Sequence, residues 1–186
     1  MVRLFVAIDL PQDLKKELYL IPDKVAKLIN NVKWVSPENV HLTLKFLGSS
    51  PEESVPKIKE KLSKKVKEVE PFTLGFGTLG AFPTSKRARV FWLGVEKGAD
   101  EVSILQKKVE KALVPLGFEK ENRKFHAHLT LARLRMPQNL QSVISELEAE
   151  KISQEVSVDR VFLFQSTLTP KGPIYTTLAQ FPLKGD

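Results

Sequence analysis

The sequence contains no cysteine, and histidine occurs only three times. Without cysteine the chain can form no disulfide, thiolate metal site or cysteine nucleophile, so any catalysis must use other groups. The apolar run at the N-terminus is interrupted by Asp9 and Pro11, which makes it too short for a secretory signal and far too short for a membrane span. We therefore expect a cytoplasmic protein that does not associate with membranes.

The length and the composition of the chain are both ordinary. The 186 residues are 42% hydrophobic and 27% charged, which is ordinary for a folded protein and unlike a disordered one. A domain usually takes about 100 to 200 residues, so we expect a single domain spanning 1–186. Lys and Arg outnumber Asp and Glu by 29 to 22, and the resulting net charge of +7 favours a polyanionic partner such as nucleic acid.

Two of the three histidines open the same tetrapeptide. The sequence His-Leu-Thr-Leu stands at 41–44 and again at 128–131, and 128 − 41 = 87 is close to half of the chain length. Repetition of a side chain as scarce as histidine with the same threonine partner indicates a duplicated unit. We expect two lobes within the one domain, each carrying one motif.

In both motifs the polar residues alternate with leucine, which is the pattern of a half-buried strand. His41 and Thr43 would then point to one side of their strand, and His128 and Thr130 to one side of theirs. An imidazole and a hydroxyl on one face offer two hydrogen bonds to a phosphate. Two such strands around a single cleft suit acid–base catalysis at phosphorus, and the residues alone leave open which histidine is the acid.

His126 precedes the second motif and has two interpretations. Its spacing to His128 occurs among metal ligands, which also need a third ligand and often a carboxylate behind them. No acidic residue lies within 124–136. We therefore expect no metal, and interpret His126 as a residue at the rim of the cleft.

The hydrophobic periodicity predicts an α+β protein with strands and helices in each half. Pro22 is expected to kink or shorten the first helix, and the many lysines of the second helix to form a solvated face. A basic loop near Arg87 could reach a phosphodiester backbone or simply be exposed. The predicted strands span 3–8, 32–35, 40–47, 72–77, 89–95, 156–168 and 174–181, and the predicted helices 13–28, 51–69, 100–113 and 137–149.

Taken together, these residues resemble the 2H phosphoesterases, and in particular their branch of RNA 2′,3′-cyclic phosphodiesterases, historically called 2′-5′ RNA ligases. The resemblance rests first on the two motifs in this order. It extends over nearly the whole chain, through 3–8, Trp34-Val35, 41–48, 89–92, 128–133 and 163–166, with Gly172 and Tyr175.

The resemblance implies two similar lobes related by a pseudo-two-fold axis, with antiparallel sheets flanking a central cleft and helices outside. It also implies metal-independent and cofactor-independent opening of an RNA 2′,3′-cyclic phosphate to a 2′-phosphate. By this likeness His41 is the proton donor and His128 the proton acceptor, while Thr43, Thr130 and Arg133 bind the phosphate. A guanidinium suits that place because it is always charged.

Further contacts and two other functions stay open. Trp34, Phe46 and Tyr175 are candidates for base stacking, although we favour a place in the core for each of them. The same histidines could serve a 2′-5′ RNA ligase that joins tRNA halves, because a 5′-hydroxyl would merely replace water. A non-catalytic RNA-binding protein would need only the basic surface, but it leaves the repeated histidines unexplained. We expect RNA with cyclic phosphate ends as the partner and a monomeric protein.

Overall fold

A computed structural model describes residues 1–25, 27–148, 155–170 and 172–185. The strands are β1 (Val2–Ile8), β2 (Val32–Trp34), β3 (Leu42–Ser50), β4 (Phe72–Phe82), β5 (Ala88–Lys97), β6 (His128–Gln138), β7 (Glu155–Val158), β8 (Arg160–Thr169) and β9 (Gly172–Pro182). The α-helices are α1 (Gln12–Leu18), α2 (Ile21–Val25), α3 (Val55–Val66), α4 (Ala99–Leu113) and α5 (Gln141–Glu148).

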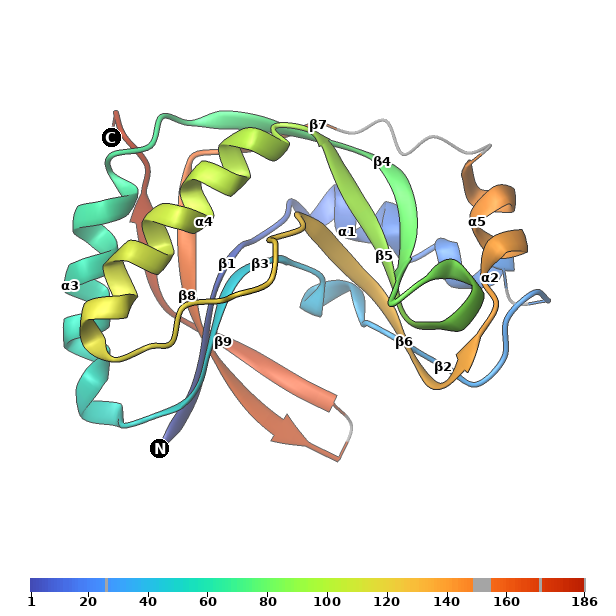
Figure 1. Ribbon diagram of the computed structural model, residues 1–186, viewed down its shortest axis with the longest axis horizontal. Coiled ribbons are helices and arrows are strands. Elements are labelled where there is room, and N and C mark those ends of the chain that lie inside the picture. The colour runs from blue at the N-terminus through green and yellow to red at the C-terminus, as the bar shows by residue number, and fades with distance from the viewer. Residues whose placement is uncertain (26, 149–154, 171, 186) are drawn as a thin grey trace.

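The described strands form one curled sheet in the order β7-β4-β5-β6-β3-β1-β8-β9, with β2 added beside β6 (Figure 1). Every pairing in it is antiparallel. The two strands that carry the repeated motifs, β3 and β6, are the central neighbours. Each motif therefore begins where one half of the sheet meets the other.

The two motif strands pair with each other at Leu42 on β3 and Leu129 on β6. These leucines occupy the same position in the two motifs. Because the strands are antiparallel, a local two-fold axis passes between them and exchanges one motif for the other. We call this pair the seam.

The duplication reaches beyond the motifs into the adjacent strands. Residues 4–8 of β1 and 91–95 of β5 are separated by the same 87 positions, since 91 − 4 = 87, and both buried strands lie next to a motif strand. In each half the chain runs from this strand through a helical segment into the motif strand and then into a further helix, α3 or α5.

Helices cover the outside of the curled sheet (Figure 1). The helix α4 follows β5 but packs against β3 of the other half and against α3. There Glu110 of α4 forms a buried ion pair with Lys45 of β3. The carboxylate of Glu110 also accepts the backbone N–H of Glu121, and Lys45 donates to the carbonyl of Glu119. The halves are thus interlocked by a polar contact as well as by the apolar core.

The α+β class with antiparallel strands and outer helices is confirmed, and so are most predicted elements. The predicted helix 13–28 is wrong, because the chain leaves α1 at Leu18 and resumes at Ile21, with Pro22 in the first turn of α2. Proline lacks the N–H that would continue a helix through this point. No helix among the described residues is long and apolar enough to cross a membrane.

Further boundaries differ from the prediction, among them those of the predicted helix 51–69, which is α-helical over Val55–Val66, and of the predicted strand 40–47, which is Leu42–Ser50. The strand 156–168 is split at Asp159, whose carbonyl accepts the N–H of Leu183 instead of continuing one ladder. The helix 137–149 begins only at Gln141, where the side chain of Asn139 accepts its N–H, and its last predicted residue lies outside the described residues. The strand 72–77 extends to Phe82 because β5 pairs with it over that length.

Candidate active site

The seam places the four motif side chains together. In the antiparallel register, the residues that flank the Leu42–Leu129 pair lie across from one another, so His41 faces Thr130 and Thr43 faces His128. The leucines are completely buried, whereas all four polar residues remain partly exposed on the opposite side. We call this side of the sheet the histidine face. The structure therefore brings both predicted pairs onto one surface.

Each histidine is fixed by its own backbone in the same way. Nδ1 of His41 lies 2.7 Å from the carbonyl oxygen of Asn39, and Nδ1 of His128 lies 2.6 Å from that of His126. A carbonyl can only accept, so in both rings Nδ1 carries the proton. Nε2 is left as the reactive nitrogen of each ring, able to accept a proton when the imidazole is neutral and to donate one when it is charged.

The loop before the first motif is itself anchored. Nδ2 of Asn39 donates to Oγ of Ser36 at 2.9 Å and to the carbonyl oxygen of Pro173 at 3.0 Å. Pro173 belongs to β9, at the far edge of the same half of the sheet. The carbonyl that orients His41 is therefore held by contacts that the motif alone does not reveal.

Aromatic rings surround His41. Its ring centroid lies 4.8 Å from that of Phe5 and 5.3 Å from that of Tyr175, which meets it edge-on. Phe164 lies next to Phe5 in a stacked arrangement at 5.2 Å. These rings exclude water from one side of the imidazole. As a result, burial lowers the pKa of His41 from 6.5 to about 4, although the hydrogen bond to Asn39 and the charge of Asp9 oppose the change.

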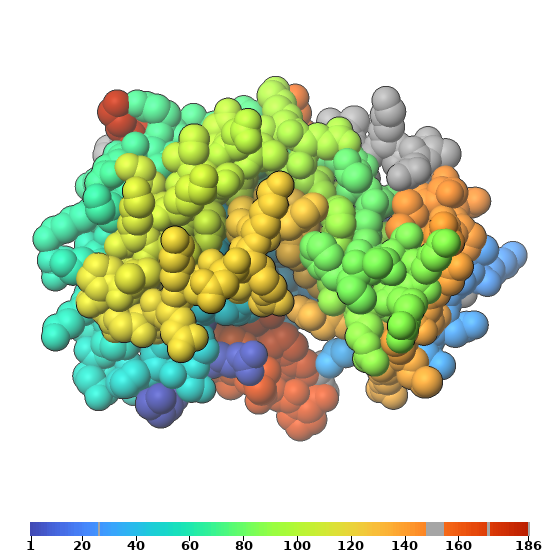
Figure 2. All heavy atoms as spheres, viewed as in Figure 1, coloured from blue at the N-terminus to red at the C-terminus, as the bar shows by residue number. Residues whose placement is uncertain are grey.

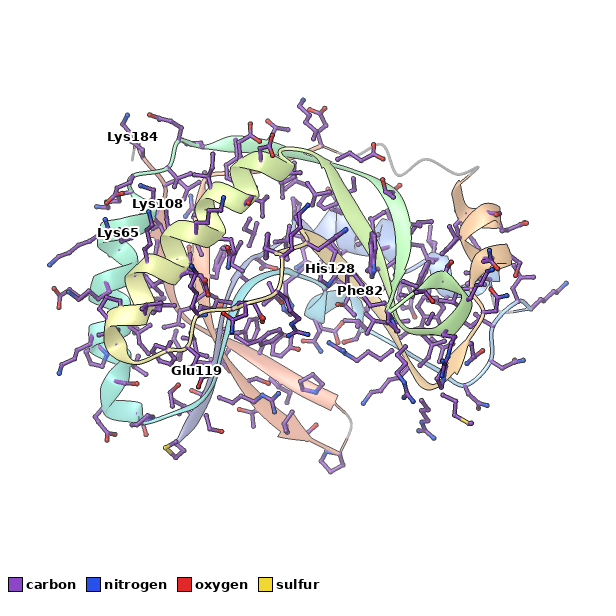
Figure 3. The ribbon with its side chains drawn as sticks, viewed as in Figure 1. Lys65, Phe82, Lys108, Glu119, His128 and Lys184 are labelled. Atoms are coloured by element: carbon purple, nitrogen blue, oxygen red, sulfur yellow. The ribbon has the colours of Figure 1, made fainter. Side chains whose placement is uncertain are left out.

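The surroundings of His128 come from β5, the strand equivalent to β1, and from its neighbour β4. Its ring lies 5.2 Å from Phe82 and 6.1 Å from Trp92, and Figure 3 shows His128 and Phe82 side by side. His126 packs on the same Trp92 at 4.7 Å and lies 6.1 Å from His128. Burial lowers the pKa of His128 as well, although the hydrogen bond to the carbonyl of His126 opposes the change. The structure thus places His126 beside the site, at its exposed edge.

The predicted Arg133 reaches the histidine face through a β-bulge. It lies five residues after His128, and in a regular strand an odd spacing would put it on the opposite side. The register with β5 shifts between the Ala132 and Thr130 pairs, and Leu131 and Ala132 are buried in succession. This extra residue restores Arg133 to the side of His128. Its positive charge lowers the pKa of both His41 and His128.

The equivalent position in the first half is occupied by Phe46. A register shift between the Lys45 and Thr43 pairs of β3 gives the same irregularity, with Leu44 and Lys45 buried in succession. Phe46 therefore lies on the histidine face, and its side chain is 64% exposed. The two halves differ at this point, because one presents an aromatic ring where the other presents a guanidinium.

The three predicted stacking residues have different environments. Phe46 is exposed on the histidine face and lies 6.0 Å from Phe5. Tyr175 borders His41, whereas Trp34 packs edge-on against the buried Phe91 and so serves the core.

In the described part of the chain, no three His, Cys, Asp or Glu side chains gather as a metal site would need. Figure 2 shows a hollow between the segment near residue 120, the loop of residues 83–87 and the β8–β9 hairpin.

Sequence reasoning missed the rings of Phe5, Phe82 and Trp92, although a signal was available. Phe5 and Trp92 are themselves 87 residues apart, like the histidines that they contact. Comparing residues 4–8 with 91–95 would have found Phe5 and Trp92.

Comparison with known proteins shows the family to which the chain belongs. The family model of the 2′-5′ RNA ligase superfamily matches residues 22–169. The chain belongs to this superfamily. It is 37% identical to the RNA 2′,3′-cyclic phosphodiesterase of Thermotoga maritima, covering 99% of this chain and 97% of the relative, and 37% identical to that of Methanothermobacter thermautotrophicus, covering 98% and 99%.

Solved structures agree with the superfamily fold. A crystal structure of TT0787 from Thermus thermophilus matches with a TM-score of 0.81 at 29% identity, covering 99% of both chains. A crystal structure of E. coli LigT complexed with 3′-AMP matches with a TM-score of 0.77 at 25% identity, again covering 99% of both chains. The resemblance inferred from the sequence and the expected class of enzyme are thereby confirmed at the level of the family.

Proposed function

We propose that the protein hydrolyses RNA 2′,3′-cyclic phosphate ends to 2′-phosphates, and that residues 1–186 act as one domain in which each lobe supplies one motif. The observation that carries the proposal is the seam, which sets two identical His–Thr pairs on one face with both Nε2 atoms available. The names of the curated relatives point to the same substrate. A terminal cyclic phosphate needs one base and one acid, which is the set that two imidazoles provide.

In the proposed reaction, Nε2 of neutral His128 accepts a proton from water as the water oxygen bonds to phosphorus. The bond from phosphorus to the 3′ oxygen breaks, and Nε2–H of protonated His41 gives its proton to that oxygen. The products are a 2′-phosphomonoester and a 3′-hydroxyl. The two histidines exchange protonation states, and proton exchange with solvent restores them.

Thr43, Thr130 and Arg133 stabilise the charge that grows on the phosphoryl oxygens. Neither threonine hydroxyl forms a hydrogen bond to any residue within the described ranges, so both can donate to a ligand. Arg133 is exposed and acts electrostatically on both histidines. Donors that are already in place before the reaction lower its barrier without further reorganisation.

The unequal surroundings support the assignment of the roles. The pKa of His41 falls to about 4, and a group with a low pKa is a strong acid once it is protonated. Such a group suits the protonation of a departing alkoxide. A bound phosphate would also favour its charged form, because it brings a negative charge close to the ring.

The test is turnover of an oligonucleotide with a 2′,3′-cyclic phosphate end, with the product assigned as a 2′- or 3′-phosphate. We expect a 2′-phosphate, activity that persists in EDTA, and a loss of roughly 10²- to 10⁴-fold in kcat for either His41→Ala or His128→Ala. Hydrolysis retained by both variants would refute the two-histidine mechanism. Tight, salt-dependent binding of RNA without turnover would indicate a binding protein instead.

The same site can in principle join a cyclic phosphate end to a 5′-hydroxyl end, and the superfamily carries the name of that reaction. Mixing tRNA halves with the protein and resolving the products measures both reactions at once. A 2′-5′-linked product that depends on the same two histidines would add ligation to the proposed activity.

A further inference from the structure

Positive charge is strongly segregated in the half of the sheet that contains β6. Three stretches, 24–37, 79–95 and 124–145, each contain three Lys or Arg and no Asp or Glu. They include β2, β5 and β6, which are neighbours in the sheet. The rest of the chain therefore carries every acidic residue, and we call the exposed Lys and Arg side chains of these three stretches the cationic surface.

Within this surface, the register sets like charges directly across from each other. Lys33 on β2 pairs with Arg133 on β6, so both side chains lie on the histidine face. Arg135 follows on β6 and is exposed, with only the buried Leu134 between it and Arg133, at the start of the stretch where the register with β5 shifts a second time. A strand rises about 3.3 Å per residue, so Arg133 and Arg135 are separated by roughly 7 Å along β6.

These cations are left unpaired. Across the described ranges, Lys33, Arg133 and Arg135 form no ion pair with an acidic side chain, whereas lysines elsewhere do, such as Lys64 with Glu60 on α3. Like charges opposed across a ladder destabilise a sheet. Their placement next to the histidines is therefore costly for the folded protein alone and favourable only with an anion between them.

We propose that Lys33 and Arg135 bind the phosphodiester that precedes the terminal nucleoside of the RNA, so that the enzyme selects oligonucleotide ends over free cyclic mononucleotides. This inference rests on the proposed function and specifies its substrate. Arg133 serves the reacting phosphate, and the row continues from it along β6 and across to β2. An RNA strand offers its next phosphate at a distance comparable with the spacing of this row.

Three substrates of increasing size test the proposal: a nucleoside 2′,3′-cyclic phosphate, the same compound with a 5′-phosphate, and a dinucleotide ending in the cyclic phosphate. For the unaltered protein we expect kcat/KM to rise about tenfold when the 5′-phosphate is added, and to stay high for the dinucleotide. In Lys33→Met and Arg135→Met, the ratio of kcat/KM with the 5′-phosphate to kcat/KM without it should fall to about 1 to 3. The gain should also shrink as salt increases.

Lys57→Met is the matched control, because Lys57 is an exposed lysine on α3, at the opposite end of the molecule from β2 (Figure 1). Lys57→Met should keep the full tenfold gain in kcat/KM when the 5′-phosphate is added. Loss of a merely structural residue would lower Tm, whereas relief of the repulsion at Lys33 should leave Tm unchanged or raise it. An unaltered ratio in both variants, or no gain from the 5′-phosphate in the parent protein, would overturn the inference. Failure to hydrolyse even the smallest substrate would instead refute the proposed function.

Discussion

The low pKa of His41 makes a quantitative prediction about stability. Burial among aromatic rings lowers this pKa from 6.5 to about 4 in the folded protein, while the unfolded chain retains the ordinary value. Between these two values the unfolded state binds a proton that the folded state does not. Lowering the pH from about 7 to 4 should therefore reduce the free energy of unfolding by about 3 kcal/mol through this residue, at about 1.4 kcal/mol per pH unit.

The measurement compares the parent protein with His41→Gln by urea unfolding at several pH values. Carboxylates titrate in both proteins, so their contribution cancels in the difference between the two free energies of unfolding. That difference should be constant above pH 7 and should change by about 3 kcal/mol, to the disadvantage of the parent, as the pH falls to 4. An NMR titration of the imidazole protons, with His41→Gln and His128→Gln for assignment, measures the pKa directly.

Two results would refute this reasoning. One is a His41 pKa near 6.5, which would mean that the rings around it do not exclude water. The other is a free-energy difference between parent and variant that stays constant across the pH range.

Other consequences of the structure can be checked in the same way. Arg133→Gln should raise the pKa of both motif histidines, measured by NMR, and reduce kcat by about 10²-fold, and Arg133→Lys should give intermediate values. Phe46→Ala should raise KM about 5- to 100-fold, since stacking contributes roughly 1–3 kcal/mol per base, and Phe46→Trp should retain the parent KM; equal values in all three would exclude stacking. Lys45→Met should lower the free energy of unfolding by about 3–5 kcal/mol because it leaves Glu110 charged and buried, and adding Glu110→Leu should recover most of that loss. Gly80→Ala should lower Tm, because its Cβ would overlap the Trp92 ring.

The motif pair and its alternation with leucine were sufficient to predict the strands, the shared face and both histidines. A period of two is a local property, so it can be read from a short segment. Sequence periodicity could not give the order of the strands. The meeting of β3 and β6 depends on contacts between residues far apart in the chain, and no local signal in Leu42 or Leu129 specifies them.

The β-bulges could not be predicted from the sequence either. Regular alternation would have put Arg133 and Phe46 on the buried side, and only the shifted registers reveal that both face the histidines. The same holds for the carbonyl of Asn39, because its role depends on a contact with Pro173, more than a hundred residues away in the chain. The predicted helix boundaries were wrong for a simpler reason. The hydrophobic periodicity continues through a proline, whereas the backbone hydrogen bonds of the helix do not.

The seam also bears on the regiochemistry of the product. A cyclic phosphate presents its 2′ and 3′ oxygens almost symmetrically, and two His–Thr pairs related by a two-fold axis could accept it in either orientation. One orientation yields a 2′-phosphate and the other a 3′-phosphate. The residues that break the symmetry next to the motifs are Phe46 in one half and Arg133 in the other. In the proposed reaction these two side chains therefore contribute to the choice between the two isomers, together with the unequal surroundings of His41 and His128, and exchanging them should erode that choice.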